Sequence, residues 1–204
     1  MHAAHDAKPT IDTPSHPSEA PAAATDEAAG TGAAPAPSDP ATRMLMGDHR
    51  ETRALLERYR MLADAGADAH ERDAVGDELC ELLIVHAVLE EEIFYPAAAA
   101  AGVEDAMLDG AEHGRVRDGV ARFRALALDD ADRSSALVEI AEAACRHGDE
   151  EEAGLFVACR TTAMDLEALA ERLNERQAEL LVNREGRAQA AQGGLMQLVK
   201  KVFG

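Results

Sequence analysis

The spacing of apolar residues constrains this chain most, because from Ala41 onwards they recur every three or four positions. That spacing places apolar side chains along one face of a helix. The connections between the patterned segments are short, so consecutive helices should run antiparallel, as in an up-down-up-down four-helix bundle. The expected helices cover about 41–65, 71–101 and 103–128, with a fourth that starts after Asp132 or Ser134 and carries Leu155 and Ala158 inward.

Composition favours an all-α fold. Aromatic residues make up 3% of the chain and tryptophan is absent, whereas Ala, Leu, Glu and Arg, which favour helices over sheets, are abundant. Gly66 and Gly102 follow the first two segments and are expected to stop those helices. Pro96 should kink the second helix, because proline has no N–H and its ring crowds the preceding turn.

The sequence predicts three parts. Residues 1–42 contain almost no large apolar side chain, so we expect a disordered tail, and removal of residues 1–40 should leave helicity and ligand content unchanged. Residues 43–160 form the predicted bundle. Residues 161–204 contain a further amphipathic helix, at about 162–182, which either packs outside the bundle or mediates a homodimer. The closing LMQLVKKVFG predicts a short helix turned onto the bundle, with a partner or membrane contact as the alternative.

Charge and cysteine content exclude several classes of partner. Acidic residues outnumber basic ones by 39 to 20, which argues against DNA, RNA and anionic membrane surfaces as partners. No apolar run is long enough to span a membrane and no hydrophobic signal segment is evident, so the expected location is the cytoplasm. Cys80, Cys145 and Cys159 form no CxxC pair and are expected to be free thiols.

Each of the four predicted bundle helices places one histidine on its apolar face. In two of them a glutamate follows four residues later, at a spacing that puts both side chains on the same face. Counting residues from each connection places all of these side chains at one level of the bundle. Buried carboxylates without partners are costly, and a cation is the natural partner. The candidate ligands are His49, His86, Glu90, His113, His147 and Glu151.

The donor set points to two transition-metal ions. Four imidazoles and two carboxylates are too many for one tetrahedral zinc and too rich in nitrogen for calcium or magnesium. Mixed imidazole and carboxylate donors suit iron, with manganese or zinc as alternatives. The ferritin-like carboxylate sites require Glu-x-x-His pairs, and none of these histidines has a glutamate three residues before it.

The motifs at these positions resemble those of the hemerythrin-like (HHE cation-binding) family. They read DHRE around His49, HAVLEEEIFYP from His86, EH at His113 and HGDEEEAGLF from His147, and the resemblance covers about residues 44–160. It implies two non-haem irons per chain, with the histidines as terminal ligands and Glu90 and Glu151 as bridging carboxylates.

The chain departs from the oxygen carriers of that family at two positions. Arg117 stands where they have a second histidine on the third helix, which implies an additional exchangeable position on one iron. Their helix-four carboxylate corresponds to Glu152, but Glu151 lies on the apolar face, so Glu151 is our assignment and Glu152 the alternative. Supporting partners for the histidines are expected among Asp48, Glu51 and Glu112, and Tyr95 can approach the site or serve packing alone.

Three functions follow from this reading. The first is a diiron protein that binds or senses oxygen, nitric oxide or iron and redox state, with a diatomic molecule or peroxide as its ligand. The second is a diiron enzyme that acts on peroxide or oxygen, although the sequence shows no substrate pocket. The third is a structural bundle with an incidental metal.

Overall fold

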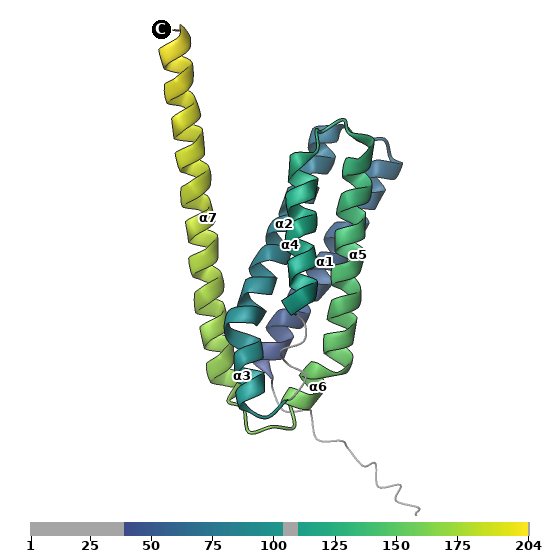
Figure 1. Cartoon of the computed structure of the whole chain (residues 1–204), viewed down its shortest axis with the longest axis vertical. Helices are drawn as coiled ribbons and strands as arrows, with labels where there is room; N and C mark the ends of the chain where they lie inside the picture. The colour runs from purple at the N-terminus through teal and green to yellow at the C-terminus, as the bar shows by residue number, and fades with distance from the viewer. Residues whose placement is uncertain (1–38, 104–109, 204) are drawn as a thin grey trace, which may run out of the picture. The chain divides into compact units, whose positions relative to one another are not determined.

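The computed structural model describes residues 39–103 and 110–203, with side chains as far as residue 184. Every regular element in these ranges is helical, which confirms the all-α prediction. The bundle is built from α1 (Pro40–Asp64), α2 (Ala69–Leu89), α4 (Gly110–Ala125) and α5 (Ala131–Ala153) (Figure 1). Both α1 and α4 contact α2 and α5, so the four helices form a closed ring. The predicted tail over residues 1–38 lies outside the described residues.

The N-terminus of α1 is fixed by buried polar contacts. The Asp39 side chain accepts a hydrogen bond from the Thr42 amide at 3.1 Å and another from Arg160 Nε at 2.8 Å. Asp39 therefore caps α1 and ties it to the end of the bundle sequence. At the other end α1 stops at Asp64, and Gly66 follows with a φ of +69°, the left-handed conformation that glycine adopts readily.

The second predicted helix is continuous but contains a wide turn. After α2 the chain forms a π-helical segment, η1 (Glu90–Phe94), and then α3 (Tyr95–Ala100). Pro96 lies in the first turn of α3 and has no N–H to donate to the carbonyl four residues back. The amide of Tyr95, just before it, donates to the carbonyl of Glu90, five residues back, which makes the turn wider than in an α-helix. The expected kink is thus a π-turn just before the proline. Gly102, with a φ of +87°, ends α3.

The boundaries of the third and fourth predicted helices differ from expectation. Val103 is not helical, residues 104–109 are outside the described range, and α4 ends at Ala125 rather than near residue 128. Asp130 caps α5, so Asp132 and Ser134 lie inside the helix. Arg133 accounts for the early start of α5, because its Nη1 donates to the carbonyls of Phe123 at 2.5 Å and Leu126 at 2.6 Å. These bonds hold the first turn of α5 against the end of α4.

The fourth predicted helix is interrupted at Gly154, after which α6 (Leu155–Cys159) begins. The interruption changes which side chains face inward. Phe156 and Cys159 are fully buried, whereas Leu155 and Ala158, which a continuous helix would have buried, are only half-buried. Leu155 still packs against the apolar cluster around Phe156, so the prediction that it points inward holds in part.

The extra C-terminal helix is α7 (Leu166–Phe203), which starts later and runs further than predicted. It contacts α1, α2 and η1 through the buried residues Leu169 and Leu173, and Arg176 forms an ion pair with Glu92 at 2.8 Å. The backbone of the last residues continues this helix, so they form no separate terminal helix as far as Phe203. Their side chains lie outside the described residues. None of the described helices is long and apolar enough to cross a membrane.

The interior consists of two apolar clusters with a polar layer between them. One cluster contains Leu45, Leu89 and Phe156, and the other contains Leu56, Leu79, Phe123 and Leu137. Along α1, His49 falls between Leu45 and Leu56, and the other bundle helices place a buried histidine at the same level. The three cysteines are free thiols, as predicted; Cys80 and Cys159 are buried and Cys145 is half-buried.

Candidate metal centre

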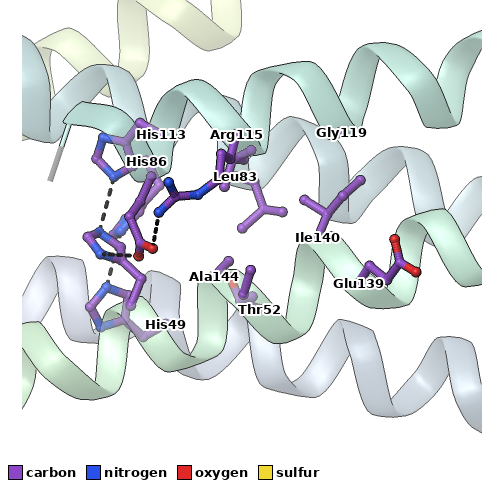
Figure 2. A pocket seen from close by; sticks show the side chains of 14 residues that line it. His49, Thr52, Leu83, His86, His113, Arg115, Gly119, Glu139, Ile140 and Ala144 are labelled. Atoms are coloured by element: carbon purple, nitrogen blue, oxygen red, sulfur yellow. Dashed lines mark hydrogen bonds and ion pairs between the residues drawn. The ribbon is translucent and has the colours of Figure 1, made fainter.

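Each of the four bundle helices contributes one buried histidine, and the four imidazoles direct their Nε2 atoms toward one another. The Nε2 atoms of His49 and His86 lie 3.1 Å apart, and those of His113 and His147 lie 3.2 Å apart. Figure 2 shows His49, His86 and His113 gathered at one end of a cavity. The imidazoles therefore form two facing pairs in the middle of the bundle.

Two buried glutamates complete the cluster. Glu90 Oε1 lies 3.2 Å from His86 Nε2, and Glu90 Oε2 lies 3.2 Å from His113 Nε2, so this carboxylate reaches one histidine of each pair. Glu151 Oε2 lies 3.4 Å from His49 Nε2 and 3.5 Å from His147 Nε2. Two groups of donor atoms are close enough to hold a metal ion: His49, His86, Glu90 and Glu151 in the first, and Glu90, His113 and His147 in the second.

The two carboxylates differ in how well their charge is stabilised. Glu90 Oε1 and Glu151 Oε2 are buried and accept no hydrogen bond. Burial disfavours the charged form of Glu90, but the surrounding imidazoles, that of His86 foremost, outweigh it and hold the pKa of Glu90 well below its usual value. Burial and the nearby charge of Glu90 raise the pKa of Glu151. A cation bound by these oxygens would take the place of the hydrogen bonds they lack and would offset the repulsion between the two carboxylates.

A carboxylate outside the cluster faces the Nδ1 atom of each histidine. An ionised carboxylate can only accept a hydrogen bond, so the proton of each imidazole is expected at Nδ1. The lone pair of a neutral ring is then at Nε2, which is directed into the cluster. The pairs are His49 with Glu152 at 2.9 Å, His86 with Asp48 at 3.2 Å, His113 with Glu91 at 3.2 Å and His147 with Glu112 at 3.5 Å.

The sequence identified only part of this outer set. Asp48 and Glu112 lie against histidines, as expected, but Glu51 is exposed and contacts none of the four. Glu91 and Glu152 were not expected in this role. A usable signal was their place directly after Glu90 and Glu151, because the side chain one residue on turns by about 100° toward the neighbouring helix.

The structure separates the roles of Glu151 and Glu152. Glu151 is 2% exposed and lies within the cluster, whereas Glu152 is 25% exposed and contacts His49 Nδ1 and Arg53 from outside. This arrangement favours Glu151 as the inward carboxylate of α5. Its assignment as a metal ligand stays a prediction, as do those of the other five residues.

Tyr95 lies in the cluster, which the sequence left open. Its hydroxyl donates to Glu151 Oε1 at 2.8 Å, and it lies 3.2 Å from Glu90 Oε2 and 3.3 Å from His147 Nε2. The π-turn before Pro96 contributes to this placement, because the extra residue rotates the side chains that follow Glu90.

Arg117 contributes no donor to the cluster. Its guanidinium binds Glu91 at 2.9 Å on the outer side of α4, and Glu91 in turn contacts His113 Nδ1. The second donor group accordingly has three members where the first has four.

Gly148 gives the His49 ring its space. A methyl group at Gly148 would lie 2.8 Å from Cγ of His49, closer than side-chain carbons normally approach. On another side the ring stacks on Phe156, with 5.8 Å between ring centres. The position of the imidazole therefore depends on a glycine in α5 and an aromatic ring in α6.

A cavity of about 290 Å³ lies next to the cluster. All four histidines line it, and it continues between α4 and α5 past Ala144 toward Gly119 and Ile140 (Figure 2). Glu90, Glu151 and Tyr95 do not line it. The cluster is thus approached from its histidine side.

Comparison with known proteins identifies the family. A model of the "Hemerythrin HHE cation binding domain" matches residues 41–159, which is more than half of the chain. Neither the curated proteins nor the solved structures include a match. The chain belongs to the hemerythrin HHE cation-binding family, and its buried histidine and glutamate clusters are suited to binding metal.

Proposed function

We propose that this member of the family holds two iron ions and binds or senses oxygen, nitric oxide or the redox state of iron. His49, His86 and Glu151 would hold one ion, His113 and His147 the other, and Glu90 both. The two donor groups thus support Glu90 as a bridging carboxylate, whereas Glu151, which was also expected to bridge, belongs to the first group alone. The observation that carries the proposal is the pair of buried carboxylate oxygens without hydrogen bonds, surrounded by four inward-facing Nε2 atoms. Imidazole mixed with carboxylate is a donor set that suits iron.

Bound iron would supply one-electron exchange with a small oxidant or a diatomic ligand. The residues of this chain prepare the site for it. The outer carboxylates hold the histidine protons at Nδ1, which fixes each ring and raises the basicity of Nε2. The hydroxyl of Tyr95 holds Glu151 in place and provides a proton beside His147. The two apolar clusters flank the polar layer on both sides.

The smaller donor set of the second group supports ligand binding there. Residue 117 is an arginine that binds Glu91, and it supplies no imidazole to this group. The group would therefore leave room for an exchangeable ligand. This feature favours sensing or redox chemistry over reversible oxygen carriage.

The cavity favours a second candidate function, a diiron enzyme that acts on peroxide or oxygen. A pocket lined by the ligand histidines and extending away from them along apolar walls is the feature that the sequence did not reveal. Such a pocket is what an enzyme needs to admit a substrate to its centre.

Metal analysis after anaerobic reconstitution tests the proposal. We expect two irons per chain, and optical spectra that change on addition of oxygen, nitric oxide or peroxide. His113→Ala should retain at most one iron, whereas His70→Ala, which removes an exposed histidine of α2, should retain both. A single tightly bound zinc with no uptake of iron would contradict the proposal.

A further inference from the structure

The cavity beside the metal centre has a chemistry of its own. Beyond the histidines its lining is mainly aliphatic, with Leu83 from α2, Val116 and Gly119 from α4, and Ile140 and Ala144 from α5. Figure 2 shows Leu83, Ile140 and Ala144 along this part of the cavity. Apolar walls favour an apolar occupant, because burial removes its surface from water.

The charged side chains Glu112, Arg115 and Glu139 of the lining each have an ion-pair partner. Arg115 forms an ion pair with Glu112, and Glu139 lies 3.9 Å from Arg122. Both Arg115 and Glu139 are largely exposed, so they belong to the rim. Among the lining residues of the rim, Glu112 and Glu139 are acidic and Arg115 is basic, and the whole chain carries a charge of −19, so the entrance disfavours an anionic ligand.

The volume exceeds what a diatomic molecule needs. A dry cavity of about 150 Å³ with aliphatic and aromatic walls is enough to bind benzene. This cavity measures about 290 Å³, and its histidine end must leave room for a ligand at the centre. The remaining space fits an organic molecule with the size of one substituted ring or a short alkyl chain.

We propose that this cavity binds a neutral, largely apolar organic molecule and holds it next to the metal centre. That the bound molecule reacts there rests on the proposed function, whereas its binding rests only on the cavity. The class of substrate would then be a small apolar compound oxidised by peroxide, so that one peroxide oxygen enters a C–H bond of the substrate and the other leaves as water.

Methyl NMR of the full-length protein tests the binding, with toluene as the neutral probe and benzoate as its anionic counterpart. Toluene should produce saturable shifts at the methyl groups of Ile140, Leu83 and Val116, in the metal-free and in the metal-loaded protein. Benzoate should produce none in the metal-free protein, where no bound cation attracts its carboxylate. The absence of saturable shifts with toluene, or equal binding of benzoate, would overturn the inference.

Variants locate the site. Ala144→Leu fills the cavity and should weaken toluene binding by about tenfold or more, whereas Ala121→Leu, on the exposed face of α4, should leave it unchanged. Ile140→Ala enlarges the cavity and should improve binding of 1,3,5-trimethylbenzene relative to toluene, which keeps the test decisive if Ala144→Leu does not fold. Unchanged preferences in Ile140→Ala would overturn the assignment of the site.

The outcomes distinguish this inference from the proposed function. Toluene binding by a protein that takes up no iron would support the cavity site and contradict the diiron proposal. Two bound irons with no toluene binding would support the diiron proposal and contradict the cavity site.

Discussion

Adjacent residues of one helix have opposite environments in this protein. Glu151 lies inside the cluster between His49 and His147, and Glu152 lies outside it against His49 Nδ1. The same division separates Glu90 from Glu91 on the second helix. One carboxylate of each pair faces the lone pairs at Nε2 and the other fixes the proton at Nδ1, so both surround the same histidines from two sides.

Substitutions within the acidic triplet of α5 test this division. Glu151→Gln should remove at least one metal ion, because a neutral amide is a weak donor and cannot offset the cation charge. Glu152→Gln should retain both ions but weaken their binding by roughly 10–100-fold, the usual effect of losing an outer carboxylate. Glu150→Gln, at an exposed position, is the control and should behave as wild type.

Metal content by mass spectrometry and competition with a chelator measure these effects. If Glu152→Gln strips the metal while Glu151→Gln keeps it, the inward carboxylate has been assigned to the wrong residue. Metal loss from Glu150→Gln would show that total charge, rather than position, governs binding.

The side chains of the centre were predictable from the sequence to different degrees. The four histidines and two glutamates stand out, because ionisable groups on apolar helix faces need partners that the same faces do not offer. The partners at Nδ1 were found only in part. Asp48 and Glu112 were expected because each is next to a histidine in the sequence, yet all four partners contact a histidine of another helix, which spacing along one helix does not show. Tyr95 could not be placed, because its direction depends on the π-turn before Pro96.

Close contacts between helices determine the position of His49. A side chain at Gly148 of α5 would meet the imidazole at 2.8 Å, and Phe156 of α6 stacks on the same ring. The break at Gly154 is what brings Phe156 inward. Gly148 and Gly154 thus both affect the position of the His49 imidazole, a candidate ligand. A count of helical turns cannot show this.

Gly148→Ala should therefore weaken binding of the ion held by His49 by about tenfold, because the ring must shift by several tenths of an ångström. The matched control is Gly114→Ala, next to His113 on α4, where an added methyl meets nothing within 4 Å. The control should bind metal normally and gain about 0.5–1 kcal/mol in free energy of unfolding. Iron titrations on both variants provide the comparison, and normal affinity in Gly148→Ala would contradict the argument.

The beginning of α1 sets the limit for shortening the chain. Asp39 is buried, caps the helix and binds Arg160, so it belongs to the bundle although the sequence placed it in the tail. Removal of residues 1–38 should leave the thermal midpoint unchanged. Removal of residues 1–40 should lower the free energy of unfolding by about 1–2 kcal/mol, the usual effect of losing a capping side chain.

Thermal unfolding of the two truncated proteins, with Asp39→Ala as a third variant, measures the effect. Asp39→Ala should resemble the longer deletion. Equal stability of all three would mean that the contacts of Asp39 with Thr42 and Arg160 contribute nothing.

At the scale of the whole bundle, the polar layer divides the apolar interior of the described residues into two clusters, so a metal bound in this layer would stabilise the fold. The helix order, ring arrangement and level of the layer followed from apolar periodicity and short connections. The cavity did not, because it depends on how α4 and α5 pack at Gly119 and Ile140. Periodicity indicates which face of a helix is buried but not where the buried faces leave space.

Stability of the metal-free protein should depend on pH through the same layer. Burial disfavours the charged form of His86, but Glu90 and Asp48 outweigh it and raise the pKa of His86 well above 6.5. A raised folded-state pKa stabilises the protein fully below the unfolded value, and that contribution is lost as the pH rises through the folded value. The raised pKa of Glu151 acts in the same direction from about pH 4.5 upward.

Bound metal replaces these protons, so the metal-loaded protein should not lose this stabilisation as the pH rises. We therefore expect chelation to lower the thermal midpoint by about 5–10 °C near neutral pH, and the difference between the two forms to grow from pH 6 to pH 8.5. Scans of both forms across this range, with Glu150→Gln as a control for surface charge, measure the difference. A gap that is absent, or that narrows as the pH rises, would place the bound metal outside the layer formed by the histidines and glutamates.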